Sequence, residues 1–413
     1  MDENNRTEQT PAVKEKKGSF GKGLVTGFLI ATVILGLIGG ILINTTFRSA
    51  NLVLDDDTTA KMGLIYSLIK TYYYKDASAE ELSEGVLKGM VEGLKDPYSQ
   101  YYTKEEYSEF LVDATGVYAG IGAVLSQNKT NGVVTIINVY EGSPAEEAGL
   151  LKGDIIISAD EYKGAEMELS EFVSHVRGDE GTNVSLKILR GRETLDVEVT
   201  RRTITVPSVD YRVLNDAKGD PVIGYVAITE FAKGTYGEFT EAIEDLKKQG
   251  VTSMIYDVRD NPGGMVDSVV DINDYLLGEG TTVYLMDHNG KREDFTSDAA
   301  TYLDMPAVVL INGNTASAAE IFSGALRDYD YATLVGTTTY GKGVVQNTYP
   351  LTDGSAVKLT VAAYYTPDGE CIHEKGISPD VELEYEYTGE GDTYDYYKDN
   401  QVAKAIEILS KGN

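Results

Sequence analysis

Cysteine is almost absent from this 413-residue chain, in which Cys371 is the only one. A single cysteine cannot close an internal disulfide, and the chain lacks the cysteine cluster that holds structural zinc. Histidine is nearly as scarce, with three copies at His175, His288 and His373. A serine-histidine-aspartate triad or a histidine-based metal site would have to be built from these three. Positive charge is also in deficit, since the formal net charge is -30, and such a surface repels nucleic acid.

One long run without charge lies near the amino terminus. Residues 23–47 contain no charged side chain, and an apolar stretch of this length can cross a bilayer as a helix. Lysines precede the run, and aspartates at 55–57 follow it. The positive-inside rule therefore predicts a single-pass protein of the cell membrane, with a cytoplasmic N-terminus at 1–22, a transmembrane helix at 23–45 and an extracytoplasmic remainder. The alternative is a secretory signal that is cleaved.

Beyond the apolar run, the hydrophobic pattern divides the chain into four parts. Apolar residues recur at helical spacing in 50–113, which predicts a helical region that could pack within the chain or form a homodimer. Short β-rich runs with turn residues fill 114–203. Buried strands alternate with helices in 204–384, which favours an α/β domain. Residues 385–413 indicate an acidic linker followed by a short C-terminal helix.

Two segments of the β-rich part resemble a PDZ domain of the bacterial protease type. The first is Tyr118-Ala-Gly-Ile-Gly-Ala, whose small residues let backbone amides converge on a carboxylate. The second is the run Ser143-Pro-Ala-Glu-Glu-Ala-Gly-Leu-Leu-Lys-Gly-Asp. In this run the serine and proline begin a short helix, and Gly149 ends it.

A PDZ groove binds an extended peptide as an added β-strand and captures its terminal carboxylate. We therefore expect peptide-binding contacts at Gly120, Ile121, Gly122 and Val124, with Val173 and Val176 as further apolar lining. The groove should then prefer protein or peptide substrates with free, apolar C-termini. The alternative is a PDZ module that is structural or regulatory and binds no tail.

Three segments of the α/β part carry residues suited to catalysis. Gly263 and Gly264 follow a buried strand and open a helix, where free amides favour an anion. Ser317 stands where a strand turns sharply into a helix, next to the free amide of Ala318. Lys342 lies between two glycines and is flanked by β runs.

These segments resemble the carboxyl-terminal processing peptidases, a serine-lysine family also called tail-specific proteases. The resemblance runs from residue 58 to the final helix and includes Asp96-Pro-Tyr-Ser and Tyr365-Thr-Pro-Asp-Gly. It implies an α/β crotonase-like peptidase core with an inserted PDZ domain, serine endopeptidase activity, and no metal or organic cofactor. The resemblance implies that Ser317 is the nucleophile, Lys342 the general base and Gln346 the residue that orients the lysine. It implies that the amides of Gly263 and Ala318 form the oxyanion hole, with Gly264 as a possible substitute for Gly263. It also implies that Asp328 is a supporting acidic residue. The family often has a second serine where this chain has Ala319, a position that is not the nucleophile.

The scarcity of histidine agrees with a lysine base. A lysine can take a proton from serine if burial lowers its pKa from about 10.4. The residues alone leave alternatives open: Lys342 as a solvated loop cation, Ser317 as a helix N-cap, and Thr315 or Ser323 as the reacting hydroxyl. For the whole chain, the competing functions are a non-catalytic PDZ adaptor on a peptidase-like scaffold and an acyl-CoA enzyme. We expect a membrane-anchored serine endopeptidase that cleaves extracytoplasmic proteins.

Overall fold

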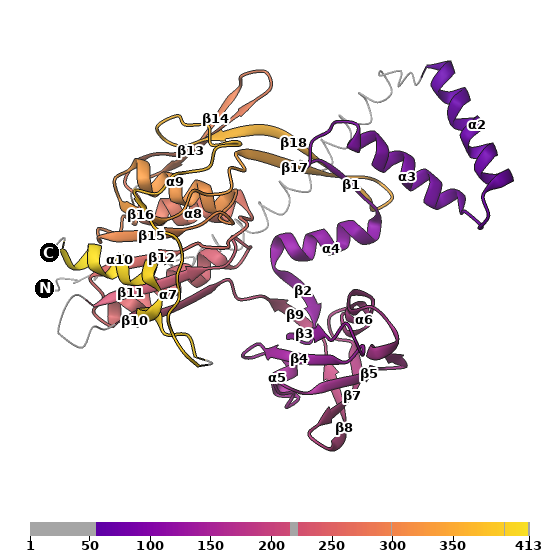
Figure 1. Cartoon of the computed structure of the whole chain (residues 1–413), viewed down its shortest axis with the longest axis horizontal. Helices are drawn as coiled ribbons and strands as arrows, with labels where there is room; N and C mark the ends of the chain where they lie inside the picture. The colour runs from indigo at the N-terminus through magenta and orange to yellow at the C-terminus, as the bar shows by residue number, and fades with distance from the viewer. Residues whose placement is uncertain (1–54, 215–221, 299, 392, 412–413) are drawn as a thin grey trace, which may run out of the picture. The chain divides into compact units, whose positions relative to one another are not determined.

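The computed structural model describes residues 55–214, 222–298, 300–391 and 393–411 (Figure 1). The chain divides into two compact units, Met1–Ser83 and Glu84–Asn413. Within the described residues, no helix has both the length and the apolar character that a bilayer crossing requires. The transmembrane helix expected at 23–45 lies outside the described residues.

The described part of the first unit is helical. Helix α2 spans Asp56–Tyr72 and begins at Asp55, whose side chain accepts a hydrogen bond from the amide of Thr58, as N-cap residues commonly do. No residue of α2 is buried, and its exposed apolar side chains include Leu64 and Leu68. Pairing of this region with a second copy stays a prediction.

The second unit contains two further helices before the PDZ-like part. Helix α3 covers Ala79–Glu92, beginning in the first unit, and α4 covers Lys104–Thr115. Between them, strand β1 (Gln100–Tyr102) pairs antiparallel with β18 (Ala356–Tyr365). The prediction of helix throughout 50–113 was wrong at β1. A three-residue strand is too short to show a period of its own, and it forms only because a partner strand supplies its hydrogen bonds.

The PDZ-like part is β-rich. Its six-stranded sheet has the order β3-β4-β5-β7-β8, with β6 paired to β5, and β2 pairs separately with β9. The strands are β2 Val117–Gly120, β3 Ala123–Gln127, β4 Val134–Val139, β5 Ile155–Ala159, β6 Tyr162–Lys163, β7 Asn183–Arg190, β8 Glu193–Thr200 and β9 Arg202–Thr205, and the helices are α5 Pro144–Glu147, η1 Gly164–Glu166 and α6 Leu169–Val176. Alternation gives β7 its buried face, because Val184, Leu186 and Ile188 join the local core while the residues between them are exposed.

A second six-stranded sheet forms the centre of the α/β part, in the order β10-β11-β12-β15-β16-β19. All neighbouring pairs are parallel except β10 with β11. Its strands are β10 Val209–Leu214, β11 Ile223–Ile228, β12 Ser253–Asp257, β15 Ala307–Ile311, β16 Ala332–Gly336 and β19 Val381–Glu382. The helices packed on it are α7 Thr235–Lys248, α8 Val266–Leu276, α9 Ala318–Asp328 and α10 Asn400–Lys411. The predicted α/β alternation is confirmed.

Strand β15 shows how both faces of this sheet are covered. Each of its five residues is buried, as expected of a central parallel strand. Val309 and Ile311 belong to the core that includes α7, α8 and α9, whereas Val308 and Leu310 belong to the core that includes α10. Helices therefore cover both faces of β15 up to its carboxyl end. From there the chain continues into the loop that carries Ser317.

The remaining strands form a five-stranded sheet around β18. They are β13 Gly280–Asp287, β14 Arg292–Ser297 and β17 Val344–Pro350, together with β1. Strand β18 pairs with β17 along its length, with β1 near its first residues and with β13 near its last. The register places Gln346 opposite Thr360, so this sheet fixes the segment that follows Lys342.

The C-terminal segment is more than a linker. A short 3-10 helix, η2 (Tyr396–Lys398), precedes α10. The ring of Tyr396 packs edge-on against Tyr225, with 4.9 Å between ring centres, and Asp399 forms an ion pair of 2.8 Å with Arg259. The acidic stretch was expected to be linker up to the final helix, and these contacts correct that expectation at its C-terminal end.

Candidate active site

Ser317 lies just beyond the carboxyl end of β15, at the start of α9, in an unusual backbone conformation. Its φ is 56° and its ψ is -117°, a combination that side-chain-bearing residues rarely adopt. Its amide donates a 2.9 Å hydrogen bond to Oε2 of Glu320, and its carbonyl accepts one of 3.0 Å from the hydroxyl of Tyr364. Both bonds use the backbone of Ser317, and the residue is only half-buried.

The two competing hydroxyls are already occupied. Thr315 is fully buried, and its Oγ1 donates to the carbonyl of Val258 at 2.8 Å. Ser323 is fully buried within α9, and its Oγ donates to the carbonyl of Ala319 at 2.7 Å. Both hydroxyls are buried and donate to backbone carbonyls, whereas Ser317 lines a cavity, so Ser317 is the reacting hydroxyl that the geometry favours.

Lys342 stands on the loop that leads into β17. Burial lowers the pKa of Lys342 below its ordinary value, the positive charge of Lys358 lowers it further, and the carboxylate of Glu320 opposes both effects. The Nζ atom lies 5.2 Å from the centre of the Tyr98 ring. The predicted direction of the pKa shift, with burial as its first cause, is confirmed, and a solvated loop cation is excluded.

One cavity of about 350 Å³ brings the expected nucleophile and base together. Ser317, Lys342 and Gln346 all line it. Within the described residues, no hydrogen bond joins Lys342 to Ser317 or to Gln346, whose Nε2 donates instead to the carbonyl of Val344 at 3.3 Å and to Oγ1 of Thr360 at 3.2 Å. The orienting role of Gln346 therefore stays a prediction.

The backbone amides beside Ser317 correct one part of the expected oxyanion hole. The amide of Gly263 donates a 2.8 Å hydrogen bond to Oδ1 of the buried Asn261, so it is not free for an oxyanion. In the part of the chain that the structure describes, the amides of Gly264 and Ala318 have no acceptor. Gly263 matters sterically instead, since a Cβ there would lie 2.7 Å from Cβ of Ser317. The geometry therefore favours Gly264 with Ala318.

Glu320 is the residue of this site that sequence reasoning missed. Its side chain is fully buried, and its two oxygens accept hydrogen bonds from two segments. Oε2 accepts from the amides of Ser317 and Lys342, each at 2.9 Å, and Oε1 accepts from the amide of Gly341 at 2.7 Å and from the hydroxyl of Thr339 at 2.5 Å. One carboxylate thus ties the backbone of the expected nucleophile to that of the expected base. The sequence did contain a signal for this contact, because a serine followed three residues later by a glutamate at a helix start is the pattern of a capping box.

Asp328 is not brought to this site. It lies at the far end of α9, eleven residues beyond Ser317 and about 16 Å along the helix axis. Its carboxylate pairs with Arg327 and accepts the amide of Asp368 at 3.0 Å. These contacts fix the C-terminal end of the helix, so the expectation that Asp328 supports catalysis was wrong in its placement.

The three histidines have separate environments. His175 stacks on Tyr162 in the PDZ-like part, with 3.5 Å between ring centres, and His288 is exposed between β13 and β14. His373 is half-buried, and its ring lies 6.3 Å from that of Tyr98. Within the described residues, no group of three or more His, Cys, Asp or Glu side chains is arranged to hold a metal ion.

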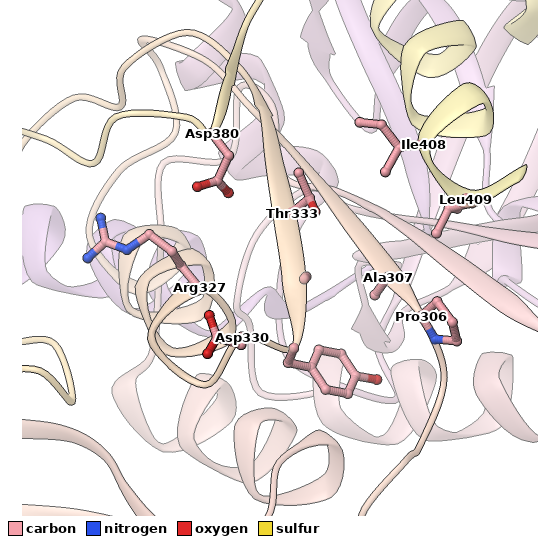
Figure 2. Close-up of a pocket in the computed structure, with 10 residues that line it drawn as sticks. Pro306, Ala307, Arg327, Asp330, Thr333, Asp380, Ile408 and Leu409 are labelled. Atoms are coloured by element: carbon pink, nitrogen blue, oxygen red, sulfur yellow. The ribbon is translucent and has the colours of Figure 1, made fainter. Parts of the chain in front are cut away.

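A second cavity lies at the opposite end of the central strands (Figure 2). Its volume is about 420 Å³, and the first residues of β15 and β16 line it together with Ile408 and Leu409 of α10. Its cation, Arg327, is already paired with Asp328 and Glu370. Ligands of parallel sheets bind outside the carboxyl ends of the strands, and that is where Ser317 lies.

The PDZ-like groove is a small cavity of about 100 Å³ between β3 and α6. Its lining includes Ile121, Val173 and Val176, as expected. Val124 is not among the lining residues. Alternation along β3 turns Ala123 and Leu125 toward the cavity and Val124 to the other face, which corrects the expectation for Val124.

The loop expected to bind a carboxylate lies between β2 and β3. In the described part of the chain, the amides of Ile121 and Gly122 have no acceptor, so they are available to a ligand. Gly122 has a φ of 77°, and a Cβ there would lie 2.4 Å from Cβ of Ser143. Beside the loop, Tyr118 packs against the guanidinium of Arg177 at 4.6 Å, and burial raises the pKa of Tyr118 to about 12.

Comparison with known proteins agrees with this arrangement. Residues 222–383 match peptidase family S41, residues 119–200 match the PDZ domain, and residues 44–106 match the N-terminal domain of the activating protease CtpB. A probable CtpA-like serine protease of Staphylococcus aureus is 36% identical over 386 residues, which cover 92% of this chain and 76% of that protein. The chain belongs to peptidase family S41.

A second curated relative and a solved structure also match this chain. A probable CtpA-like serine protease of Staphylococcus epidermidis is 36% identical over 363 residues, covering 87% of this S41 peptidase and 72% of the relative. The solved structure of the photosystem II D1 C-terminal processing protease is 29% identical, with 77% of this chain and 86% of that chain covered and a TM-score of 0.47. The family match, the PDZ match and the curated relatives make the chain a serine peptidase with a PDZ domain, whose substrates are proteins or peptides.

The first prediction concerns the buried carboxylate of Glu320 in this S41 peptidase. Glu320→Gln keeps the shape of the side chain but replaces one acceptor oxygen with a donor that faces backbone amides. We expect cleavage of an unfolded protein substrate to fall at least about 100-fold, and the free energy of unfolding to fall by about 1–3 kcal/mol because buried donors lose their acceptor.

The measurements are the cleavage rate and the urea midpoint. Glu370→Gln is the matched control, because that carboxylate is exposed and pairs only at the surface with Arg327. Wild-type values of both quantities in Glu320→Gln would contradict the bridging role.

Proposed function

We propose that this S41 peptidase is a membrane-anchored serine endopeptidase in which Ser317 is the nucleophile and Lys342 the general base. The observation that carries the proposal is the shared cavity: it holds the half-buried serine, a lysine whose pKa burial lowers, and Gly264, whose amide has no acceptor in the described chain. Such a set supplies the nucleophile, base and anion site that acyl transfer needs.

The reaction follows from these positions. Oγ of Ser317 attacks the scissile carbonyl while neutral Nζ of Lys342 accepts its proton. The amides of Gly264 and Ala318 stabilise the oxyanion, and the lysine returns the proton to the departing amine. Water then attacks the acyl-enzyme, again with Lys342 as base, and releases Ser317. In this proposal the mixed α/β core is crotonase-like, and Gln346 orients the lysine in the substrate complex.

A groove beside the catalytic cavity supports cleavage within an extended chain. It has a volume of about 950 Å³ and shares Gly264, Met265, Val266, Val345 and Gln346 with the catalytic cavity. Strands β13, β14, β17 and β18 and the start of α8 line it. A groove of this size next to the catalytic cavity accommodates several residues of a peptide, which a peptidase requires and a non-catalytic adaptor does not.

The dyad gives the second prediction. Lys342→Arg should reduce cleavage of an unfolded protein at least about 1000-fold, because a guanidinium stays protonated and cannot take the serine proton. Ser317→Ala should abolish turnover and leave the thermal midpoint close to wild type. Thr315→Ser serves as the control, because its hydroxyl retains the same buried acceptor and should leave activity nearly unchanged. Wild-type cleavage by either dyad variant would refute the assignment.

The second prediction extends to the pH dependence of cleavage, whose direction follows from the lowered pKa of Lys342. The base works only when neutral, and the pKa of Lys342 is lowered, so kcat/KM should rise with pH through a midpoint below that of an ordinary lysine. Lys358→Gln removes a positive charge that lowers this pKa, and it should move the midpoint to higher pH. A midpoint that moved to lower pH would place Lys342 outside the influence of Lys358.

The PDZ groove is proposed to read substrate C-termini through the free amides of Ile121 and Gly122. The third prediction uses the Ser317→Ala protein, so that peptides are bound and not cleaved. Amidation of an apolar C-terminus should weaken binding by about 10-fold or more, because the amides lose a charged acceptor. Leu125→Ala should weaken binding and Val124→Ala should not. Equal affinity for free and amidated peptides, measured by calorimetry, would show that no carboxylate is captured.

Anchoring is proposed from the charge pattern around 23–45, which predicts that the peptidase lies on the outer side of the cell membrane. The fourth prediction is that protease added to intact cells digests the ectodomain and leaves a short protected N-terminal fragment, detected with an N-terminal tag. Cells opened before digestion are the control and should leave no such fragment. A fully released enzyme with a new N-terminus near residue 50 would contradict the anchor.

A further inference from the structure

The turn Asp96–Ser99 is part of neither the dyad nor the oxyanion hole, yet it contacts the surroundings of both dyad partners. Its own geometry is fixed by Asp96, whose Oδ1 accepts the amide of Tyr98 at 3.0 Å and whose Oδ2 accepts the hydroxyl of Ser99 at 2.5 Å. A carboxylate that accepts from its own following residues makes a stable turn. The turn therefore presents Tyr98 and Ser99 in a defined arrangement.

Tyr98 lies over the lysine. Its ring centre is 5.2 Å from Nζ of Lys342, a distance at which a ring both covers an amine and interacts with its charge. The ring of Tyr98 also lies 6.3 Å from that of His373, and Tyr340 lies near its hydroxyl. One side of the lysine amine thus faces an aromatic ring and not water.

Ser99 reaches the same site by a second route. Its Oγ accepts a 3.0 Å hydrogen bond from the amide of Thr360, in β18. Oγ1 of Thr360 in turn accepts from Nε2 of Gln346 at 3.2 Å. A chain of hydrogen bonds therefore connects Asp96 through Ser99 and Thr360 to Gln346, the residue expected to orient the lysine.

We propose that the turn Asp96–Ser99 is a positioning element for Lys342, in which Tyr98 keeps water from the lysine amine and Ser99 fixes the strand that holds Gln346. The inference rests on the proposed function, since it assigns a role toward the proposed general base. It makes the segment before β1 part of the catalytic unit, although the nucleophile lies more than 200 residues further along the chain.

Two effects of the Tyr98 ring on the lysine have opposite signs. The bulk of the ring excludes water, which favours the neutral amine and lowers its pKa. The face of the ring attracts the ammonium, which favours the charged form and raises its pKa. Burial is the largest influence on the pKa of Lys342. Removal of the whole ring exposes the amine to water, so it should raise this pKa. The other charged or titratable groups around Lys342 and Tyr98 are Asp96, Glu320, Tyr340, Lys358, Tyr364 and His373.

These opposite signs give a sharp experiment on the full chain in detergent. The readout is the pH profile of kcat/KM for cleavage of fluorescein-labelled casein, with Ser317→Ala as the blank. Tyr98→Ala admits water, and its midpoint should rise by about one pH unit, which lowers kcat/KM near neutral pH about tenfold. Tyr98→Leu keeps bulk without the aromatic face, and its midpoint should fall. Tyr98→Phe keeps both features and should follow the wild type.

A second pair of variants tests the chain of hydrogen bonds from Asp96 through Ser99 to Thr360. Ser99→Ala removes the link between Asp96 and Thr360 and should raise the midpoint. Ser83→Ala is the matched control, because that hydroxyl is exposed and donates only to the carbonyl of Ala79 within α3, and it should leave the profile unchanged. A purely structural role for the turn would lower the amount of folded enzyme without moving any midpoint.

The outcomes separate this inference from the proposed function. If the wild type cleaves no faster than Ser317→Ala, the proposed function fails and the inference fails with it. If the wild type cleaves but Tyr98→Ala and Tyr98→Leu both keep its midpoint, the inference alone is overturned. If Tyr98→Ala does not fold, as judged by circular dichroism, a wild-type midpoint in Tyr98→Leu overturns the inference, and a lowered one supports it.

Discussion

The carboxylate of Glu320 is the constraint on which the catalytic arrangement depends. A fully buried charge is costly unless polar donors replace the water that it has lost. Here the donors are three backbone amides and one hydroxyl, drawn from the start of α9 and from the loop before β17. The start of a helix also favours a negative charge. Because the two segments share one acceptor, the backbones of Ser317 and Lys342 cannot move apart without depriving the buried carboxylate of hydrogen-bond donors.

A second buried network holds the loop that carries Gly264, one of the two proposed oxyanion-hole residues. Arg259 pairs with Asp257, at the end of β12, and with Asp399, just before α10. Two carboxylates around one buried guanidinium are stable only while the geometry stays close, since removal of one partner leaves an uncompensated charge. The C-terminal segment thus fastens the beginning of the loop, and Asn261 and Gly263 continue it toward Ser317. The linker-like acidic composition concealed this role, because composition does not show which aspartate is buried.

The residues that were placed wrongly share one cause. Gly263 was expected to offer its amide, but the side chain of Asn261 takes it. Val124 was expected in the peptide groove, but the register of β3 turns Leu125 there instead. Asp328 belongs to the right helix but to its far end. In each case the residue type was suitable, and the error lay in direction or partner, which depend on atoms from elsewhere in the chain.

The sequence by itself determined the α/β alternation, the PDZ-like part and the serine at a strand-to-helix turn, and it led to the prediction of a lysine as the base. Hydrophobic period, glycine positions and the scarcity of histidine are local properties that a linear sequence displays. Only the tertiary structure decided which amides are free, that Glu320 joins the two catalytic segments, and that the turn Asp96–Ser99 lies against Lys342. These are relations between residues up to 261 positions apart. Hydrogen-bond pairing and exclusion of water arise when distant segments pack together, so no local pattern records them.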